Sequence, residues 1–359
     1  MKFSVPFGTL LFALLLVSCS TGLLKYDKVE QLKKNEEFEE AVKIVKPPEA
    51  TVGSETDKKA EIQAPPEKKQ TPNLPQAKKK TPVKKKPVKE AKEAPKAAPE
   101  EPKVVIRQPD IEDTVGFEEG SRRPIADPFR VGEEVIHDVH YFKVSAGELR
   151  IKVEPYSMVN NRKSYTFSME IKTSSLFSTF YSVDDRAEIF VDYEDLVPRV
   201  FQLHVKESGQ LREAKMLFDV ENNTAKFWEK KVTKDHGEEE KKQEWEILPF
   251  SQNVYSAVYY MRNFQWEPGK EYAFRVANDK ENLVFSGKAL RREVLDTKLG
   301  PMKAIVVQPN IVLKGKFKPI GDNFIWLSDD DRKYILRIES KIKIGTLVSE
   351  VVAINPGKP

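Results

Sequence analysis

The chain has almost no cysteine: Cys19 is the only one among its 359 residues. One thiol cannot form an intramolecular disulfide, so any folded domain must be stabilised by its own hydrophobic core. The sequence also lacks a strong charge of one sign, because its formal net charge is only +4. A net charge this small gives no electrostatic reason to expect nucleic acid as a partner.

Long apolar runs are missing as well, except for one at the N-terminus. This run extends from Leu10 to Val17 and follows a single positive charge at Lys2. It is too short to span a bilayer comfortably and is typical of an export signal. The sequence Leu16-Val17-Ser18-Cys19 resembles a bacterial lipobox. We therefore predict that residues 1–18 are a lipoprotein signal peptide and that Cys19 carries the lipid. The alternative is a secreted protein in which this cysteine is incidental.

A lipid on Cys19 would anchor the mature protein to a membrane that it does not cross. The next residue is Ser20 and not aspartate. In the usual sorting rule for Gram-negative lipoproteins, this implies delivery to the outer membrane. We expect an outer-membrane anchor with the protein facing the periplasm, and anchoring to the inner membrane or at the cell surface is the alternative.

Residues 19–46 are expected to form a lipidated N-terminus followed by a short amphipathic helix. No glycine or proline interrupts residues 23–46, and Phe38, Ala41, Val42 and Val45 fall on one helical stripe. Such a helix would lie near the membrane surface, or it would dock onto a partner.

Proline, lysine and glutamate dominate the next segment, which we predict to be a disordered linker over residues 47–125. Aromatic residues are absent from residues 47–103, and such a composition cannot bury enough apolar surface to fold. As extended polyproline II its proline-rich part would reach roughly 180 Å, and as a flexible coil about 40 Å. Seven lysines and no acid lie between Lys78 and Lys89. They keep a spacer extended, or they contact an anionic polymer or lipid headgroups.

Residues 126–359 have the pattern of a β-rich domain. Apolar and polar residues alternate over many short segments, for example at Leu149, Ile151 and Val153, which predicts half-buried antiparallel strands. Asn160-Asn161 is a hairpin turn by this criterion. The charged residues 234–242 are expected to form a long exposed hairpin tip.

One segment breaks the strand pattern and predicts a helix. Ser251 can cap it after Pro249, and Val254, Ala257 and Met261 give it an apolar stripe. We therefore predict a mostly β fold: an antiparallel curved sheet, or a barrel or half-barrel, around one principal helix. Curling the sheet around the helix would remove exposed edges and supply a core.

Several segments of this domain together resemble the bacterial family called domain of unknown function 3108 (DUF3108). They lie in order within residues 130–352 and are Val131-Gly132-Glu133-Glu134 with residues 139–147, residues 249–262 with residues 266–269, and residues 325–332 with residues 337–339 and Gly345. The family has no agreed activity. The resemblance implies an exported, β-rich domain and supplies no catalytic residues.

The sequence shows no constellation that indicates catalysis. It has no Gly-x-Ser-x-Gly nucleophile motif and no phosphate loop. His137 and His140 have an odd offset, which on a strand places them on opposite faces. No zinc ligand set is visible around His204 and His236, and residues 329–331, three aspartates, are expected to form a polar turn. We predict no catalytic residue, no cofactor and no metal site.

Aromatic side chains offer the only candidate ligand site. They gather near residue 180 and on the predicted helix, and they would line an apolar cleft between sheet and helix. Core packing is the alternative. The candidate residues are Phe177, Phe180, Tyr181, Tyr255, Tyr259 and Trp266.

These features predict a non-enzymatic, membrane-anchored periplasmic lipoprotein that binds a protein partner or an apolar envelope ligand. A structural bridge between membrane and cell wall, with peptidoglycan as the partner, is the first alternative. An enzyme that modifies envelope glycans or lipids is the second.

Overall fold

A computed structural model describes residues 32, 34–47, 109–141, 144–312, 322–342 and 345–358. The predicted signal peptide, Cys19 and most of the predicted linker lie outside the described residues. All of these described residues belong to one compact unit. The fold below is that of this unit.

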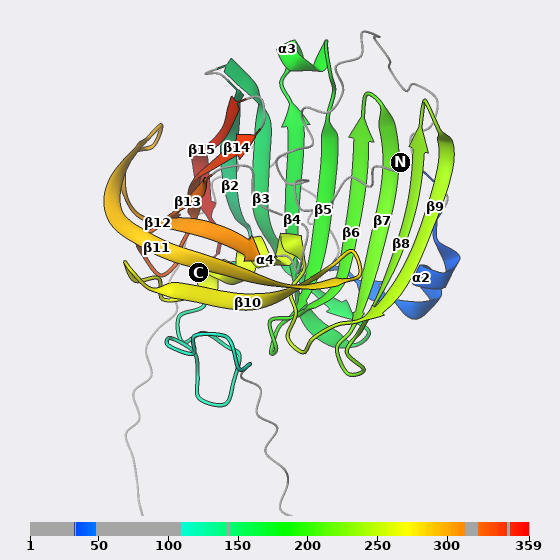
Figure 1. The fold of residues 1–359 in the computed structure, drawn as a ribbon, viewed down its shortest axis with the longest axis horizontal. Coiled ribbons are helices and arrows are strands. Elements are labelled where there is room, and N and C mark those ends of the chain that lie inside the picture. The colour runs from blue at the N-terminus through cyan, green and yellow to red at the C-terminus, as the bar shows by residue number, and fades with distance from the viewer. Residues whose placement is uncertain are drawn as a thin grey trace, which may run out of the picture. The chain divides into compact units, whose positions relative to one another are not determined.

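A single antiparallel sheet of 15 strands dominates the fold (Figure 1). Its strand order is β10-β11-β12-β13-β14-β15-β2-β3-β4-β5-β6-β7-β8-β9, and the short β1 pairs with β3. The first strands in the chain are β1 (Ile44–Val45), β2 (Glu133–Tyr141), β3 (Val144–Val159), β4 (Arg162–Thr173), β5 (Asp184–Asp192), β6 (Pro198–Glu207), β7 (Gln210–Asp219), β8 (Thr224–Thr233) and β9 (Gly237–Glu246). The remaining strands are β10 (Glu271–Asn278), β11 (Glu281–Thr297), β12 (Gly300–Val312), β13 (Asn323–Ser328), β14 (Ile335–Ile342) and β15 (Gly345–Pro356).

The sheet is strongly curved but it does not close, because its end strands β9 and β10 are not paired. Side chains connect the two ends of the sheet without backbone pairing. Lys241 Nζ lies 2.7 Å from Asp279 Oδ1, and Asn282 Nδ2 donates to the carbonyl of Glu246 at 3.0 Å. The predicted curved antiparallel sheet is therefore confirmed in its open form.

The principal helix lies against the concave face of the sheet, as predicted. Helix α4 (Val254–Tyr260) continues into the 3₁₀ helix η2 (Met261–Asn263). Asn253, and not the predicted Ser251, caps α4: its side chain accepts from the backbone N–H of Ser256, whose hydroxyl accepts from the backbone N–H of Asn253. None of the helices in the described ranges has the length and apolar character needed to cross a membrane.

Two hydrophobic cores lie on opposite faces of the strands β12 to β14. Ile305 and Val307 belong to the main core, which includes α4, whereas Ala304 and Val306 belong to a second core with Trp326. Successive residues of a strand point to opposite faces, so these strands are buried on both sides. This explains why their apolar runs are continuous while those of β3 alternate.

Two expectations from composition are only partly right. Residues 234–236 are the exposed tip of the β8–β9 hairpin, but residues 237–246 form the strand β9 and pair with β8 along its whole length, so the tip is shorter than expected. Opposite charges face each other across the pair, as at Lys230 and Glu240 with 2.8 Å between Nζ and Oε1. Charged residues are common on edge strands because they oppose further pairing between chains.

The predicted linker also ends earlier than residue 125. Residues 109–125 pack onto the domain: Arg122 is 1% exposed, and the ring of Phe117 lies 5.8 Å from that of Phe264. Phe117 and Pro124 form an antiparallel bridge. The aromatic and arginine side chains of this stretch are buried against the domain, and the polar composition of the stretch does not predict this.

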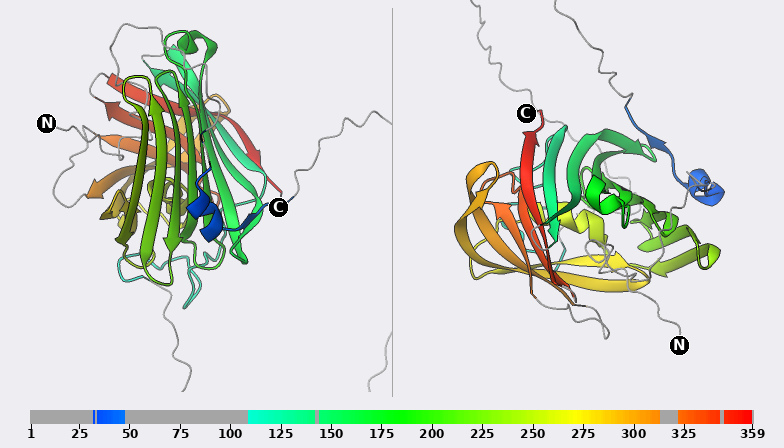
Figure 2. Two further views of the ribbon diagram at one scale, coloured as in Figure 1. Left: turned by 90° about the vertical axis from the view of Figure 1, so that its right-hand side faces the viewer. Right: turned by 90° about the horizontal axis from the view of Figure 1, so that it is seen from above.

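The predicted N-terminal helix is shorter than expected where the structure describes it. Helix α2 (Glu36–Ala41) begins after Asn35, whose side chain accepts from the backbone N–H of Phe38, and it ends at Val42. The chain then becomes extended and forms β1, which suits its β-branched residues. Figure 2 shows α2 on the outer side of the sheet, against the domain.

Candidate functional site

The structure places the six predicted aromatic residues in two groups. Tyr255, Tyr259 and Trp266 are buried in the main core. The ring of Tyr259 stacks on Phe167 at 4.1 Å, and its hydroxyl donates to the carbonyl of Ser168 at 2.7 Å. These contacts are those of core packing.

The other three aromatic residues lie in the connection between β4 and β5, around the short helix α3 (Ser175–Ser178). Phe177 is half-buried and Phe180 is 81% exposed. Tyr181 points inward and its hydroxyl donates to Glu207 Oε2 at 2.5 Å. The structure therefore brings Tyr181, and not the two phenylalanines, to a buried polar group.

That group, which we name the concave carboxyl cluster, is formed by Tyr181, Asp185, Glu207, Arg212 and Glu229. Alternation places each strand residue of the cluster on the concave face. Asp185 is in phase with Ala187 in β5, and Glu207 is in phase with Val205 in β6. The sheet therefore carries acidic residues on the same face as its main core.

Strand register brings Asp185 and Glu207 close together. Val183 pairs with Glu207 and Arg186 pairs with His204, so Asp185 lies opposite Val205 and diagonal to Glu207. On the next strand, Arg212 lies opposite Val205 and forms an ion pair with Glu229 of β8. Four adjacent strands thus contribute to one cluster near the end of the sheet that carries α3.

Each of the two central carboxyls has one oxygen that is engaged and one that is not. Asp185 Oδ1 accepts from the backbone N–H of Lys206 at 3.0 Å, and Glu207 Oε2 accepts from Tyr181 and from Gln210 Nε2. Asp185 Oδ2 and Glu207 Oε1 are buried without a hydrogen-bond partner. The two residues are 6% and 5% exposed. Burying a polar atom unpaired costs about 1–3 kcal/mol, so such atoms in a native fold call for an explanation.

Burial changes the protonation of these carboxyls. Burial, together with the charge of Glu207, raises the pKa of Asp185 to about 8. Burial also raises the pKa of Glu207, although hydrogen bonds from Tyr181 and Gln210 oppose this. At neutral pH Asp185 is therefore mostly protonated and can donate as well as accept a hydrogen bond. Buried groups with shifted pKa values are characteristic of functional sites.

The histidines and the aspartate triplet belong to separate parts of the fold. His137 is fully buried with Nδ1 3.1 Å from Ser349 Oγ, and burial lowers its pKa to about 4. His140 lies beside Asp138, and His204 Nδ1 lies 2.5 Å from Glu213 Oε1. His236 lies in an exposed turn.

Residues 329–331 form the predicted polar turn, in which Asp330 accepts from Ser328 and from two backbone N–H groups. In the part of the chain that the structure describes, no three His, Cys, Asp or Glu side chains are grouped so that they could hold a metal ion.

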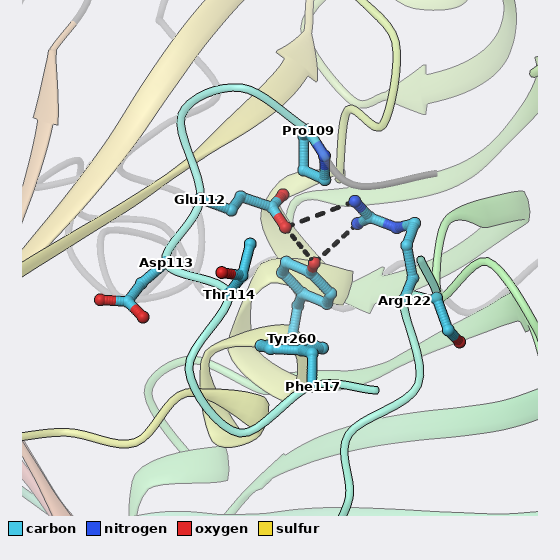
Figure 3. Close-up of a pocket in the computed structure, with 8 residues that line it drawn as sticks. Pro109, Glu112, Asp113, Thr114, Phe117, Arg122 and Tyr260 are labelled. Atoms are coloured by element: carbon cyan, nitrogen blue, oxygen red, sulfur yellow. Dashed lines mark hydrogen bonds and ion pairs between the residues drawn. The ribbon is translucent and has the colours of Figure 1, made fainter. Parts of the chain in front are cut away.

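A second buried polar group lies where residues 109–122 meet α4 (Figure 3). Tyr260 Oη lies 2.5 Å from Glu112 Oε2, and Arg122 Nη2 donates to Tyr260 Oη at 2.6 Å. The adjoining cavity has a volume of about 10 Å³, which is close to the minimum for one water molecule. This group fastens residues 109–122 to the helix and offers no room for a larger ligand.

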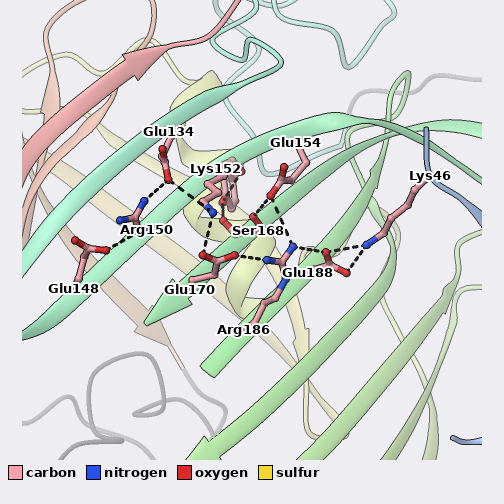
Figure 4. A network of polar contacts seen from close by, with 11 residues as sticks. Lys46, Glu134, Glu148, Arg150, Lys152, Glu154, Ser168, Glu170, Arg186 and Glu188 are labelled. Atoms are coloured by element: carbon pink, nitrogen blue, oxygen red, sulfur yellow. Dashed lines mark hydrogen bonds and ion pairs between the residues drawn. The ribbon is translucent and has the colours of Figure 1, made fainter. Parts of the chain in front are cut away.

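The convex face of the same sheet carries a ladder of paired charges (Figure 4). Arg150 Nη1 lies 2.9 Å from Glu134 Oε1, and Lys152 Nζ lies 3.0 Å from Glu170 Oε2. Lys46 from the N-terminal segment lies 2.8 Å from Glu188 and extends the ladder. These side chains are partly exposed, and the carboxylates named here are paired.

The family model for the proteins of unknown function termed DUF3108 matches residues 137–352. The chain belongs to the DUF3108 family. The resemblance noted from the sequence is thereby confirmed for the β-rich domain. No curated protein matches the chain.

Two solved structures of low sequence identity are similar to the chain. One is a β-barrel-like protein of the domain of unknown function DUF1849 from Brucella abortus, with 9% identity and a TM-score of 0.42; the match covers 63% of this chain and 98% of that chain. The other is a candidate lipoprotein from Parabacteroides distasonis ATCC 8503, with 10% identity and a TM-score of 0.25; the match covers 63% of this chain and 95% of that chain.

Proposed function

We propose that this DUF3108 protein is a lipid-anchored envelope protein that acts by binding and not by catalysis. The observation that carries the proposal is the pair of buried, unpartnered oxygens, Asp185 Oδ2 and Glu207 Oε1, on the concave face. A bound group that donates hydrogen bonds to both would remove the cost of leaving them unpaired. The lipobox-like residues 16–19 support the anchor and a location in the cell envelope, with the outer membrane and the periplasm as the expected site.

The composition of the concave carboxyl cluster favours a ligand with an amino group. Three carboxyls, those of Asp185, Glu207 and Glu229, accompany a single Arg212, so the cluster attracts positive charge. An ammonium group has three donors and no acceptor. Its charge would lower the pKa of Asp185, and once this carboxyl has lost its proton the ammonium can donate to both open oxygens and retain one donor.

The rim next to the cluster adds an apolar component. Phe180 immediately precedes Tyr181 and is 81% exposed, and Leu176 in α3 is 61% exposed. Apolar side chains beside a few converging polar groups are typical of small-molecule sites. We therefore expect an amphiphilic envelope ligand, or a partner segment, that presents an amine next to an apolar part.

Native mass spectrometry of the gently extracted full-length protein tests this binding function. We expect a co-purifying ligand whose occupancy falls at least about tenfold in the double variant Asp185→Asn/Glu207→Gln. Asp184→Asn is the matched control, because the adjacent Asp184 is exposed and pairs with Lys172 at 3.1 Å. Equal occupancy in all three proteins would contradict the proposal. Membrane fractionation of Cys19→Ser tests the anchor separately, and we expect this variant to leave the membrane fraction.

Acid–base chemistry on envelope glycans or lipids is a second candidate function. It is favoured by the raised pKa of Asp185, since a carboxyl protonated at neutral pH can serve as a general acid. Incubation of the purified protein with envelope fragments distinguishes the two functions. Product formation that disappears in Asp185→Asn would replace the binding function with an enzymatic one.

A further inference from the structure

We propose that residues 35–46 act as a strap that fixes the anchored end of the chain to the β-rich domain. The proline-rich segment would then be a closed excursion from this domain and not a spacer between it and the membrane. The strap is defined as Asn35–Lys46 and comprises α2 and β1. The inference about membrane distance rests on the proposed lipid at Cys19, whereas the docking itself does not.

The strap packs on an apolar patch of the convex face. Phe38 is 1% exposed and Val42 is 5% exposed. The ring of Phe38 lies 5.8 Å from that of Trp228 in an edge-to-face contact, and Phe190 lines the same cluster. An edge-to-face aromatic pair adds to the stabilisation from buried area. These contacts make Phe38 the anchor of the strap.

Charged side chains fix the helix of the strap from both sides. Glu37 accepts from Trp228 Nε1 at 3.1 Å and from Lys242 Nζ at 2.7 Å. Lys215 Nζ donates to Glu39 at 2.6 Å and lies 4.5 Å from the centre of the Phe38 ring. The acidic helix thus meets lysines of β7 and β9. The positive charge beside the apolar patch is therefore complementary to the negative charge of the strap.

Backbone pairing continues the contact beyond the helix. Ile44 and Val45 pair with Val159 and Met158 at the end of β3. The backbone N–H of Lys43 donates to Asn160 Oδ1 at 2.8 Å, and the backbone N–H of Asn160 donates to the carbonyl of Lys43 at 3.0 Å. Strand addition of this kind supplies affinity from the main chain, while pockets for side chains supply specificity.

The topology then determines the distance from the membrane. The chain contacts the domain at residues 35–46 and contacts it again from residue 109 onward, and both stretches belong to one compact unit. Whatever the extension of residues 48–108, the residues before and after them are attached to the same domain, so they add nothing to its distance from the membrane. The span from Cys19 to the domain is therefore limited to the 16 residues before Asn35, or about 55 Å when fully extended.

Release of the strap would change this reach several-fold. The chain from Asn35 to Pro109 would then be added, at about 3.1 Å per residue roughly 230 Å if it were polyproline II. Docking of the strap is intramolecular, so the covalent connection raises its effective concentration. A bridge between membrane and cell wall would require release, whereas a binding protein close to its membrane would not.

Cleavage of the proline-rich segment in membranes tests the docking. A specific protease site is inserted between Pro75 and Gln76 of the full-length protein, and the domain is followed between membrane and supernatant. We expect the domain to stay with the membrane after cleavage, because the strap holds it. Phe38→Ala should weaken docking about a hundredfold and release the domain, whereas Val45→Ala, at a position 52% exposed, should not.

Two further variants separate loss of docking from loss of folding. Val45→Cys/Met158→Cys should form a disulfide across the β1–β3 pair and retain the domain even with Phe38→Ala, until a reductant is added. Val45→Cys with Val294→Cys, at an exposed position of β11, is the control and should not cross-link. Release of the wild-type domain on cleavage would overturn the inference. Absence of the uncleaved protein from the membrane would instead overturn the lipid anchor.

Discussion

The two faces of the central sheet carry the same kinds of charged residue in different states. On the convex face, Arg150 and Lys152 pair with carboxylates in partly exposed positions. On the concave face, Asp185 and Glu207 are buried, and each retains an oxygen without a partner. Asp184 and its neighbour Asp185 show the contrast within two residues, since Asp184 is exposed and paired with Lys172.

The difference separates exposed charges that are paired from buried carboxyls that each keep an oxygen without a hydrogen-bond partner. Exposed ion pairs contribute little to stability because water screens them and side-chain entropy opposes them. Buried carboxyls cost free energy unless they are paired or protonated. The concave carboxyl cluster therefore stands out because the fold retains it at a cost.

Loss of the one buried ion pair in the cluster should have the largest effect. Arg212→Met leaves Glu229 without its cation in a site where Arg212 is 7% exposed. We expect the free energy of unfolding to fall by about 4 kcal/mol, as is typical when one partner of a buried pair is removed. Urea unfolding measures it. A loss below about 1 kcal/mol would show that this buried pair contributes no more to stability than the exposed pairs of the convex ladder.

The buried His137, which lies in phase with Val139 of the main core, should make the protein sensitive to acid. Its pKa is lowered to about 4 by burial, against 6.5 for the free side chain. The unfolded chain therefore binds more protons between these values, and stability falls as pH drops from about 6.5 to about 4. We expect His137→Gln to reduce the loss between pH 7 and pH 4 by about 3 kcal/mol. Urea unfolding at both pH values, with His236→Gln as the control, measures the difference.

Asp185 should act in the opposite direction. Because its pKa is raised to about 8 in the fold and is near 3.8 otherwise, the folded protein binds more protons and stability falls as pH rises between these values. Asp185→Asn keeps the acceptor for Lys206 and should stabilise the protein by about 2 kcal/mol at pH 5.5. Thermal unfolding against pH measures this. Asp184→Asn should change the stability little. An equal gain in stability from this variant would contradict the contrast between the buried and the exposed carboxyl.

The convex ladder should give the smallest effect. Arg150→Ala removes pairs with Glu134 and Glu148 at a side chain that is 37% exposed. We expect a loss of about 0.5 kcal/mol that shrinks further at high salt. A double-mutant cycle with Glu134→Ala measures the coupling. A coupling above about 2 kcal/mol would show that the exposed ladder stabilises the fold as strongly as the buried pair does.

Sequence reasoning succeeded where the pattern was local. Alternation at Leu149, Ile151 and Val153 predicted β3, and the positive φ angles of Asn160 and Asn161 (46° and 66°) confirm the predicted hairpin turn. It failed for most of β9, because the charged residues of this edge strand contain no apolar alternation that would mark a strand. The site was missed because Asp185 looks like part of a polar turn. Its phase with Ala187 and Ile189 was the available signal.

The six aromatic residues show the same limit. They were predicted to line one apolar cleft, with core packing as the alternative, but register decided that Tyr259 packs in the core while Tyr181 reaches Glu207. No local pattern connects residue 181 with residue 207. Only pairing of β5 with β6 brings them together.

The sequence by itself determined the antiparallel strands, the principal helix and the family, because these depend on periodicity and on residues close together in the chain. It also determined the expectation of a lipid at Cys19. The tertiary structure decided which carboxyls are buried and where the N-terminal segment lies. Phe38 docks against Trp228, 190 positions away in the sequence, since burial of an aromatic ring depends on the surface available to it. For that reason the proline-rich segment, which by composition is a spacer, connects two points of the same domain.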